Sequence, residues 1–402
     1  MSRKCPSCAT VFEDDTFFCG HDGTITLQVQ SADDVDPRVG TQLGDYIVVA
    51  RVADGGMGRV YEGRHPQTRQ RMAIKVLHPE IAADNVAVER FKREFETANE
   101  FKHPHIVAVH EFGSTPEGSY FMTMEYLYGE ELSAAIRRSG PQPIPRVVQT
   151  LCQAALALDY AHSFGVIHRD LKPDNLFLCQ REQGDDVRVL DFGSVKLQME
   201  TGPKLTAFGT TLGSPYYMSP EQAMGKLDVD QRTDVFAVTA ILHEMVTGTV
   251  AFSGDNVAAI LMNIIKGDPT PASSLNPDIP QALDAVIEQG VAKEKGQRFA
   301  SVSALAEAAL RAFGLSGSAE EWAGKSVAEI EAAVSSATPP AAPAFGAMPG
   351  MDAIPSAMSS LPPDRPSATD ALPSSPMLKW VAVGAAVFVL LGLAGGLWAF
   401  LS

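Results

Sequence analysis

Residues 168–175 and 191–193 hold side chains whose types and spacing suit one kind of chemistry. Asp170 is placed to accept or orient the proton of an attacking hydroxyl. Asn175 and Asp191 offer oxygen ligands of the kind that Mg²⁺ (or Mn²⁺) prefers, and Lys172 can reach a transferred phosphate. Phosphoryl transfer needs positioning and charge neutralisation more than covalent help. The pattern therefore predicts transfer of a phosphoryl group from ATP to a protein hydroxyl.

A glycine-rich stretch upstream is expected to lie over the phosphates. Residues 47–52 are typical of a strand, because they are rich in β-branched side chains, and they lead into a turn with three glycines. Glycine lacks a Cβ, so its backbone N–H groups can approach phosphate oxygens closely. Ala53 stands where the first glycine of the usual pattern is expected. The predicted ATP-binding residues in this stretch are Val52, Ala53, Asp54, Gly55, Gly56, Met57, Gly58, Arg59 and Val60.

Lys75, on the next predicted strand, supplies the cation that phosphates require. Residues 88–96 have apolar side chains at helical spacing, and Glu94 belongs to this predicted helix. We predict that Glu94 forms an ion pair with Lys75. The alternative is that Glu94 is one of several charges on a solvated helix face.

The two motifs at residues 168–175 and 191–193 occur in the expected order and follow Lys75 and Glu94. This combination argues against a chance match. Residues 46–313 resemble a eukaryotic-like serine/threonine protein kinase of the kind found in bacteria. The resemblance implies an α+β, bilobal protein-kinase fold, with a β-rich N-terminal lobe, a helical C-terminal lobe and ATP between them. It implies ATP and Mg²⁺ as ligands and proteins with Ser or Thr as substrates. Lys172, two residues after Asp170, resembles the serine/threonine branch rather than the tyrosine branch.

The same resemblance assigns further residues. Glu125 and Leu127 of the predicted hinge would offer backbone groups to adenine, Met124 would be the gatekeeper, and Glu131 would meet the ribose. The alternative for residues 124–126 is an ordinary apolar strand end.

Residues 213–221 resemble the segment that ends the activation loop of this family, with Ser219 in place of the usual alanine. The resemblance implies that Glu221 pairs with Arg298 and that Asp234 is buried beneath the catalytic loop.

Arg169 precedes the catalytic aspartate, and kinases with this arginine use it to bind a phosphate on the activation loop. We predict autophosphorylation in that loop, at Thr206 first, with Thr210 or Thr211 next. The alternative is that these threonines are only polar loop residues.

Composition limits the other classes of function. The chain has 402 residues, of which 45% are hydrophobic and 20% are charged, so it can bury a large core. Its formal net charge of −16, with no basic run, argues against nucleic acid as a partner.

Three of the five cysteines lie near the N-terminus and resemble a small zinc ribbon over residues 1–30. Cys5, Cys8 and Cys19 are candidate ligands of Zn²⁺, with His21 or Asp22 as the fourth. The alternatives are a flexible tail with reduced thiols and a ribbon that has lost its metal. Cys152 and Cys179 lie in apolar surroundings and are predicted to be small core residues, as expected in a reducing compartment.

The remaining segments are predicted to be connectors and an anchor. Residues 31–45 form a linker, and residues 314–377 form a Pro-, Ala- and Ser-rich, largely disordered linker. Within it, residues 318–335 have helical apolar spacing and form a short helix that is either docked on the kinase or exposed.

Residues 380–401 carry no charge and are long enough to cross a hydrocarbon core of roughly 30 Å, so residues 378–402 are predicted to be a single transmembrane tail anchor. The kinase would then lie in the cytoplasm, at the cytoplasmic membrane. A buried C-terminal helix is the alternative. Gly392 and Gly396 have the spacing that lets two membrane helices pack closely, which would form a homodimer.

Two classes of function follow. The first is an active, membrane-anchored serine/threonine kinase in signal transduction, favoured by the intact set of catalytic side chains. The second is a pseudokinase or scaffold that keeps the fold and acts through binding.

Overall fold

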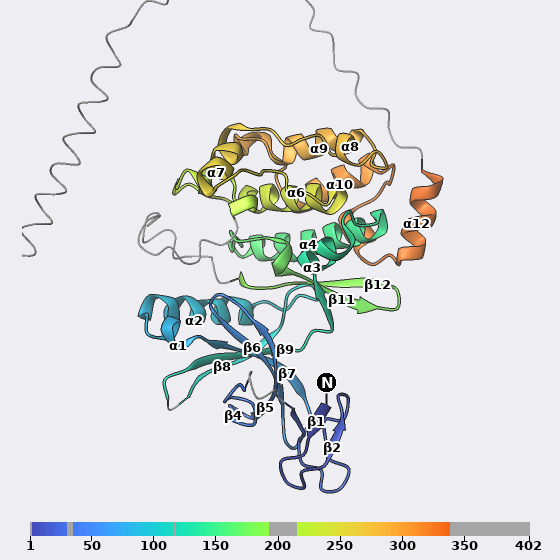
Figure 1. Ribbon diagram of the computed structural model, residues 1–402. Helices are drawn as coiled ribbons and strands as arrows, with labels where there is room; N and C mark the ends of the chain where they lie inside the picture. The colour runs from blue at the N-terminus through green and yellow to red at the C-terminus, as the bar shows by residue number, and fades with distance from the viewer. Residues whose placement is uncertain (1, 30–34, 116, 193–214, 338–402) are drawn as a thin grey trace, which may run out of the picture. The chain divides into compact units, whose positions relative to one another are not determined.

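The computed structural model describes residues 2–29, 35–115, 117–192 and 215–337. These residues all belong to one compact unit, Met1–Ala344, and residues 345–402 lie outside the described part of the chain. The compact unit combines a small N-terminal sheet, a sheet-rich half and a helical half (Figure 1).

The N-terminal residues 2–28 form a small three-stranded sheet, called the ribbon from here on. Its three strands are β1 (Ser2–Lys4), β2 (Val11–Glu13) and β3 (Leu27–Gln28), in the order β2-β1-β3 with antiparallel pairing. Cys5 and Cys19 are buried although the ribbon is too small for much of an apolar core.

The sheet-rich half is a six-stranded antiparallel sheet with one long helix. The strands are β4 (Gln42–Leu43), β5 (Tyr46–Asp54), β6 (Gly58–Arg64), β7 (Arg71–Leu77), β8 (Val109–Ser114) and β9 (Tyr120–Glu125). Their order is β4-β5-β6-β7-β9-β8. The short α1 (Pro79–Ala82) leads into α2 (Asn85–Glu100), whose first turn is capped by the Asp84 carboxylate accepting from the N–H of Val86.

The predicted helix and strands of this half are confirmed. The apolar residues of α2 that recur at helical spacing pack on the sheet, where Phe91 is fully buried and Val88 and Phe95 are partly buried.

The sheet begins earlier in the sequence than expected. Residues 31–45 were predicted to be a linker, but Leu43 of β4 is buried against Tyr46 in the sheet core, so the folded lobe starts before residue 46. A two-residue strand is too short to show an alternating pattern.

The helical half has α4 and α6 in its core. Its helices are α3 (Leu132–Ser139), α4 (Ile144–Ser163), α5 (Pro220–Ala223), α6 (Arg232–Thr247), α7 (Val257–Lys266), α8 (Ala272–Leu275), α9 (Ala282–Gly290) and α10 (Val302–Ala312). A second three-stranded sheet, β10 (Gly129–Glu131), β11 (Leu176–Arg181) and β12 (Gly184–Val189), lies at the edge of this half that faces the larger sheet (Figure 1).

Two further helices extend this half beyond the predicted domain end at residue 313. They are α11 (Ala319–Ala323) and α12 (Val327–Ser336), each started by a serine capping box. Both are held on α4, because the side-chain amide of Gln153 donates to the carbonyl of Ala323 at 3.1 Å and that of Gln149 to the carbonyl of Lys325 at 2.8 Å. Ile330 is fully buried.

The predicted start of the disordered linker at residue 314 is therefore wrong, and the docked alternative for residues 318–335 is confirmed as two helices rather than one. The expected helix is broken because Ser326 caps a new first turn.

The predicted anchor, residues 378–402, lies outside the described residues. Among the described ones, no helix has both the length and the apolar character needed to span a membrane.

Candidate functional site

The catalytic loop of the sequence prediction lies between α4 and β11. It contains His168, Asp170 and the short 3₁₀ helix η1 (Pro173–Asn175). The Asn175 side-chain amide donates to the carbonyl of Asp170 at 2.7 Å, which closes the loop on itself. The Asp170 side chain is 44% exposed, and the Lys172 ammonium lies 3.9 Å from its carboxylate. A carboxylate held this way is accessible to a reacting hydroxyl.

Asp234, in the first turn of α6, anchors this loop from below as predicted. Its carboxylate accepts from the backbone N–H groups of His168 at 2.8 Å and Arg169 at 2.9 Å. It also accepts from Nε2 of His162 at 2.7 Å. Burial works to raise the pKa of Asp234, but the hydrogen bond from His162 outweighs it and lowers that pKa. A buried, ionised carboxylate thus fixes the position of the loop backbone.

Lys75 is the centre of the site. Its ammonium, on β7, lies 2.7 Å from a carboxylate oxygen of Glu94 on α2 and 2.8 Å from one of Asp191, which follows β12. Lys75 and Glu94 are both buried. The predicted pairing of Glu94 with Lys75 is confirmed, and the solvated alternative is wrong. Three segments far apart in the sequence meet at one ammonium.

The charges of this triad depend on one another. Burial works to lower the pKa of Lys75, but the carboxylates of Asp191 and Glu94 outweigh it and raise that pKa. Burial would raise the pKa of Asp191, and the Lys75 ammonium reverses the effect and lowers it. Burial dominates at Glu94 and raises its pKa above the ordinary range. Two acids share one base, so a further cation would be favourable beside the Asp191 carboxylate.

The backbone bends sharply where these side chains meet. Arg169 and Asp191 have positive φ angles of 65° and 55°, which residues with a side chain seldom adopt. Such strain persists where neighbouring contacts impose it. Phe192 supplies such a contact, because its buried ring packs against the rings of Phe101 at 5.3 Å and His168 at 4.9 Å. Asp191 is thereby turned towards Lys75 while the next residue enters the core.

The candidate metal ligands are brought close through the backbone. The N–H of Leu190, directly before Asp191, donates to the carbonyl of Asn175 at 2.9 Å. Nε2 of His168 donates to the carbonyl of Leu190 at 2.8 Å. An amide oxygen and a carboxylate on tethered neighbouring segments are a donor set that suits Mg²⁺.

The glycine-rich residues form the hairpin between β5 and β6, beside the triad. The N–H of Gly55 donates to the carbonyl of Gly58 at 2.9 Å, and Val60 is the direct partner of Lys75 in the β6–β7 ladder. A Cβ on Gly58 would lie 2.1 Å from the carbonyl oxygen of Val76, so no larger residue fits there. The turn leads into β6, which pairs with the strand that carries Lys75. The backbone amides of the turn can therefore contact phosphates bound by that lysine.

The predicted hinge begins at Glu125, the last residue of β9. The Glu125 carboxylate accepts from the backbone N–H of Ala108 at 3.0 Å and from Nε of Arg188 at 3.3 Å, so this side chain holds the strand end in place. Glu131 accepts from the hydroxyl of Ser133 at 3.2 Å at the start of α3. The backbone of Leu127 lies between these two points.

The pair predicted between Glu221 and Arg298 is present. The guanidinium donates to both carboxylate oxygens, at 2.7 and 2.8 Å, and the Arg298 side chain is fully buried.

Two residues that hold this region in place were not predicted from the sequence. The Gln222 side-chain amide donates to the carbonyl of Arg169 at 2.7 Å, which ties α5 to the catalytic loop. The second residue is His162. Its spacing of three residues from Asp159 on one helix was the signal in the sequence that could have indicated an ion pair.

The N-terminal cysteines form a second cluster. One donor atom each from Cys5, Cys8, Cys19 and Asp22 lies within 4.8 Å of all the others. Nδ1 of His21 lies 3.8 Å from Sγ of Cys8 but does not belong to this set. Three sulfurs and a carboxylate in this arrangement suit a tetrahedral zinc ion.

Cys152 and Cys179 are buried as predicted, and burial raises the pKa of their thiols to about 12 and about 11. The candidate phosphorylation sites Thr206, Thr210 and Thr211 lie outside the described residues.

His162 makes the stability of the site depend on pH. Burial works to lower its pKa, but two neighbouring carboxylates raise it from 6.5 to about 9. These are Asp159, 3.6 Å from Nδ1, and Asp234, which accepts a hydrogen bond from Nε2 at 2.7 Å. The protonated imidazole therefore stabilises the fold fully below pH 6.5, and this contribution is lost as pH rises through about 9. We expect the free energy of unfolding to fall by roughly 3 kcal/mol across this window, and His162→Gln to remove the slope. Chemical denaturation at a series of pH values measures both, and parallel curves for the two proteins would contradict the assignment.

Comparison with known proteins agrees with this geometry. The protein kinase domain model matches residues 46–310. The chain is 36% identical over 278 residues to the serine/threonine-protein kinase PknH of Mycobacterium bovis, covering 69% of this chain and 46% of that protein. It is 37% identical over 277 residues to the serine/threonine-protein kinase pkn3 of Myxococcus xanthus, covering 67% and 50%. This chain thus spans about half the length of these relatives.

A solved structure is also similar. The kinase domain of PknI from Mycobacterium tuberculosis aligns with a TM-score of 0.53 and 29% identity, over 67% of this chain and 97% of that one. The residues that the family model matches include both the lysine triad and the catalytic loop. The chain therefore belongs to the protein kinase family.

Proposed function

We propose that this chain is a serine/threonine protein kinase, which transfers the γ-phosphate of ATP to Ser or Thr hydroxyls of proteins. The observation that carries the proposal is the contact of Lys75 with both Glu94 and Asp191, next to a loop that exposes Asp170. The names of the relatives PknH and pkn3 support the serine/threonine class. Lys172 near Asp170 is the feature of this chain that agrees with them.

Each residue has a separate role in the proposed reaction. Asp170 accepts or orients the proton of the substrate hydroxyl, and the Lys172 charge lies where the transferred phosphate passes. Asn175 and Asp191 would hold Mg²⁺, which neutralises phosphate charge when bound. Lys75, positioned by Glu94, binds the phosphates of ATP, with the glycine hairpin above them. Backbone groups of Glu125 and Leu127 receive adenine, and Glu131 meets the ribose.

Regulation by phosphorylation of the activation loop is part of the proposal. The backbone of Arg169 is held by Asp234, which accepts a hydrogen bond from its N–H. The buried Nε of its side chain has no hydrogen-bond partner among the described residues. A phosphate on Thr206, Thr210 or Thr211 would supply a strong acceptor to this guanidinium. Autophosphorylation would then order the loop.

The setting of the kinase is proposed from sequence alone. Residues 380–401 would anchor the chain in the cytoplasmic membrane with the kinase domain in the cytoplasm, and Gly392 and Gly396 would let two anchors associate.

Transfer of labelled phosphate from Mg²⁺-ATP by the full chain tests the proposed activity. Asp170→Asn should reduce transfer by at least about 10²-fold without changing thermal stability, because the proton acceptor is lost while the loop contacts remain. The matched control is Asp228→Asn, at a carboxylate that is 87% exposed and far from the loop in the sequence.

Retained transfer in Asp170→Asn would refute the role of that residue. A parent chain that is folded and binds ATP but shows no transfer would favour the pseudokinase or scaffold function instead.

We also propose that the ribbon holds one zinc ion through Cys5, Cys8, Cys19 and Asp22. Backbone N–H groups of Cys8 and His21 each lie 3.4 Å from a neighbouring cysteine sulfur, an arrangement that stabilises thiolates. The N–H of Thr24 donates to the Asp22 carboxylate at 2.9 Å and fixes its direction. Asp22 is therefore preferred over His21 as the fourth ligand.

Metal analysis of the purified chain should find about one zinc per chain. Asp22→Asn should weaken retention of zinc during dialysis against a chelator by about 10-fold or more, and Asp15→Asn, on the same ribbon, should not. If His21→Asn releases zinc and Asp22→Asn does not, the fourth ligand is His21. Absence of zinc from the parent chain would refute the site.

A further inference from the structure

Two aromatic rings of the ribbon contact arginines of the sheet-rich half. Phe18 has the guanidinium of Arg69 at 4.6 Å from its ring centroid, and Phe17 makes the closer contact. Phe17, between β2 and β3, has the guanidinium of Arg64 at 3.8 Å from its ring centroid and that of Arg3 at 4.3 Å. Arg64 belongs to β6 of the kinase domain, whereas Arg3 belongs to the ribbon. The negative π face of this ring attracts guanidinium groups of the ribbon and of the kinase domain, and so stabilises the contact between the two.

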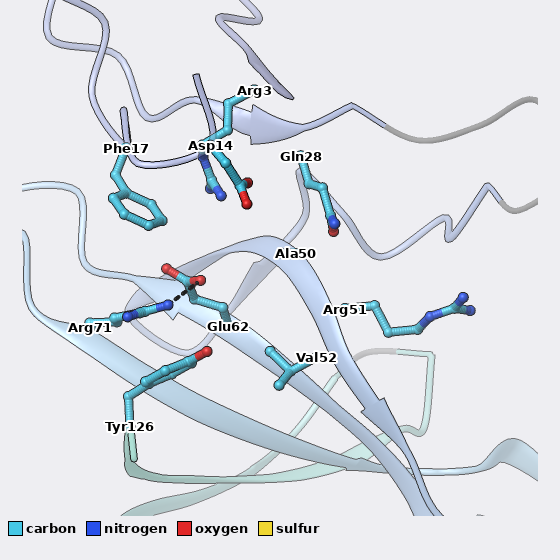
Figure 2. Close-up of a pocket in the computed structure, with 10 residues that line it drawn as sticks. All are labelled: Arg3, Asp14, Phe17, Gln28, Ala50, Arg51, Val52, Glu62, Arg71 and Tyr126. Atoms are coloured by element: carbon cyan, nitrogen blue, oxygen red, sulfur yellow. Dashed lines mark hydrogen bonds and ion pairs between the residues drawn. The ribbon is translucent and has the colours of Figure 1, made fainter. Parts of the chain in front are cut away.

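Glu62 links this contact to the neighbouring strand. Its carboxylate binds Nε of Arg64 at 2.8 Å and a terminal nitrogen of Arg71 at 2.9 Å. The Glu62 side chain is only 5% exposed, so the two guanidinium groups share one buried anion. Arg71 itself lies 5.3 Å from the Phe17 centroid. The ring, both arginines and the glutamate form one connected cluster. Figure 2 shows Phe17, Glu62 and Arg71 of this cluster.

Arg71 extends the cluster to the hinge. Its guanidinium stacks over the ring of Tyr126 at 3.5 Å and lies 4.6 Å from that of Tyr128. Tyr126 stands between Glu125 and Leu127, the two residues whose backbone is proposed to receive adenine. Arg71 also begins the strand that carries Lys75. The cluster therefore runs from the ribbon to the adenine side of the proposed ATP site.

Close packing does not explain the position of the Arg71 side chain. A cavity of about 230 Å³ lies beside it, lined among others by Phe17, Glu62 and Tyr126 (Figure 2). Space on this side would let the guanidinium move away from Tyr126 if one of its partners were lost. Its position thus depends on Phe17, Glu62 and the two tyrosines.

We propose that the docked ribbon sets the affinity of the kinase for nucleotide, with Phe17 and Arg71 as positioning residues that act on the hinge through Tyr126. The inference rests on the proposed function only in that the hinge binds adenine. Neither residue touches the nucleotide. Loss of the Phe17 contact frees Arg71 and Tyr126, and the adenine-binding backbone loses its fixed geometry, whereas Asp170 and its loop are unaffected.

The test compares two substitutions of Phe17 in the full chain. Phe17→Leu keeps an apolar side chain but removes the π face, and Phe17→Trp keeps the face. We expect Phe17→Leu to raise the Kd for Mg²⁺-ADP, and the KM for ATP, by on the order of fivefold with kcat unchanged, and Phe17→Trp to retain parent values. Val11→Ala, at an exposed ribbon residue, is the control.

A second variant separates the relay from general damage to the ribbon. Arg71→Gln should raise the same Kd, and the Phe17→Leu, Arg71→Gln double variant should lose no more affinity than the weaker binder of the two single variants, because both act through one contact. Zinc content equal to that of the parent would show that the ribbon remains folded.

Equal nucleotide affinity in Phe17→Leu and the parent would overturn the proposal, as would additive losses in the double variant. A folded parent that binds no nucleotide would instead overturn the proposed function, and with it the premise of the relay.

Discussion

The rest of the site depends on a buried ammonium shared by two carboxylates. Lys75 is held between Glu94 and Asp191 at hydrogen-bond distance, where an unpaired charge would be costly. The contact exists only if β7, α2 and the end of β12 are all in place. A buried ion pair adds little net stability, since desolvation offsets most of the attraction. Its value here lies in geometry, because it specifies one arrangement of three segments around the place proposed for the phosphates.

The helical half uses the same device to fix its loops. Asp234 binds two backbone N–H groups of the catalytic loop, and Arg298 holds Glu221 in a bidentate pair. Gln222, next to Glu221, then reaches the carbonyl of Arg169. Charge-assisted hydrogen bonds thus join α6 to the loop that bears Asp170 and hold Glu221 of α5, and the neutral bond from Gln222 joins α5 to the same loop. Backbone strain at Arg169 is tolerated because these contacts outweigh it.

Much of this site was predictable because the chemistry fixes residue types at fixed spacing. Lys75, Glu94, Asp234 and the pair of Glu221 with Arg298 could be identified from motifs, and α2 from its apolar period. The limits of the domain could not be predicted. At the start, β4 is too short to show an alternating pattern, and at the end a capping serine divides α11 from α12. The contact of Phe17 with Arg64 was also hidden, since stacking between residues distant in the sequence leaves no periodic signature.

The rate of phosphate transfer by Lys75→Met at saturating Mg²⁺-ATP measures how far the site depends on this ammonium. The raised pKa of Glu94 allows that carboxyl to become neutral when its partner is lost, so the variant should remain folded. We expect a rate at least about 10²-fold below that of the parent, and a normal rate for Lys293→Met, a partly buried lysine in the helical half. Transfer by Lys75→Met within about twofold of the parent would contradict the claim that this ammonium organises the site.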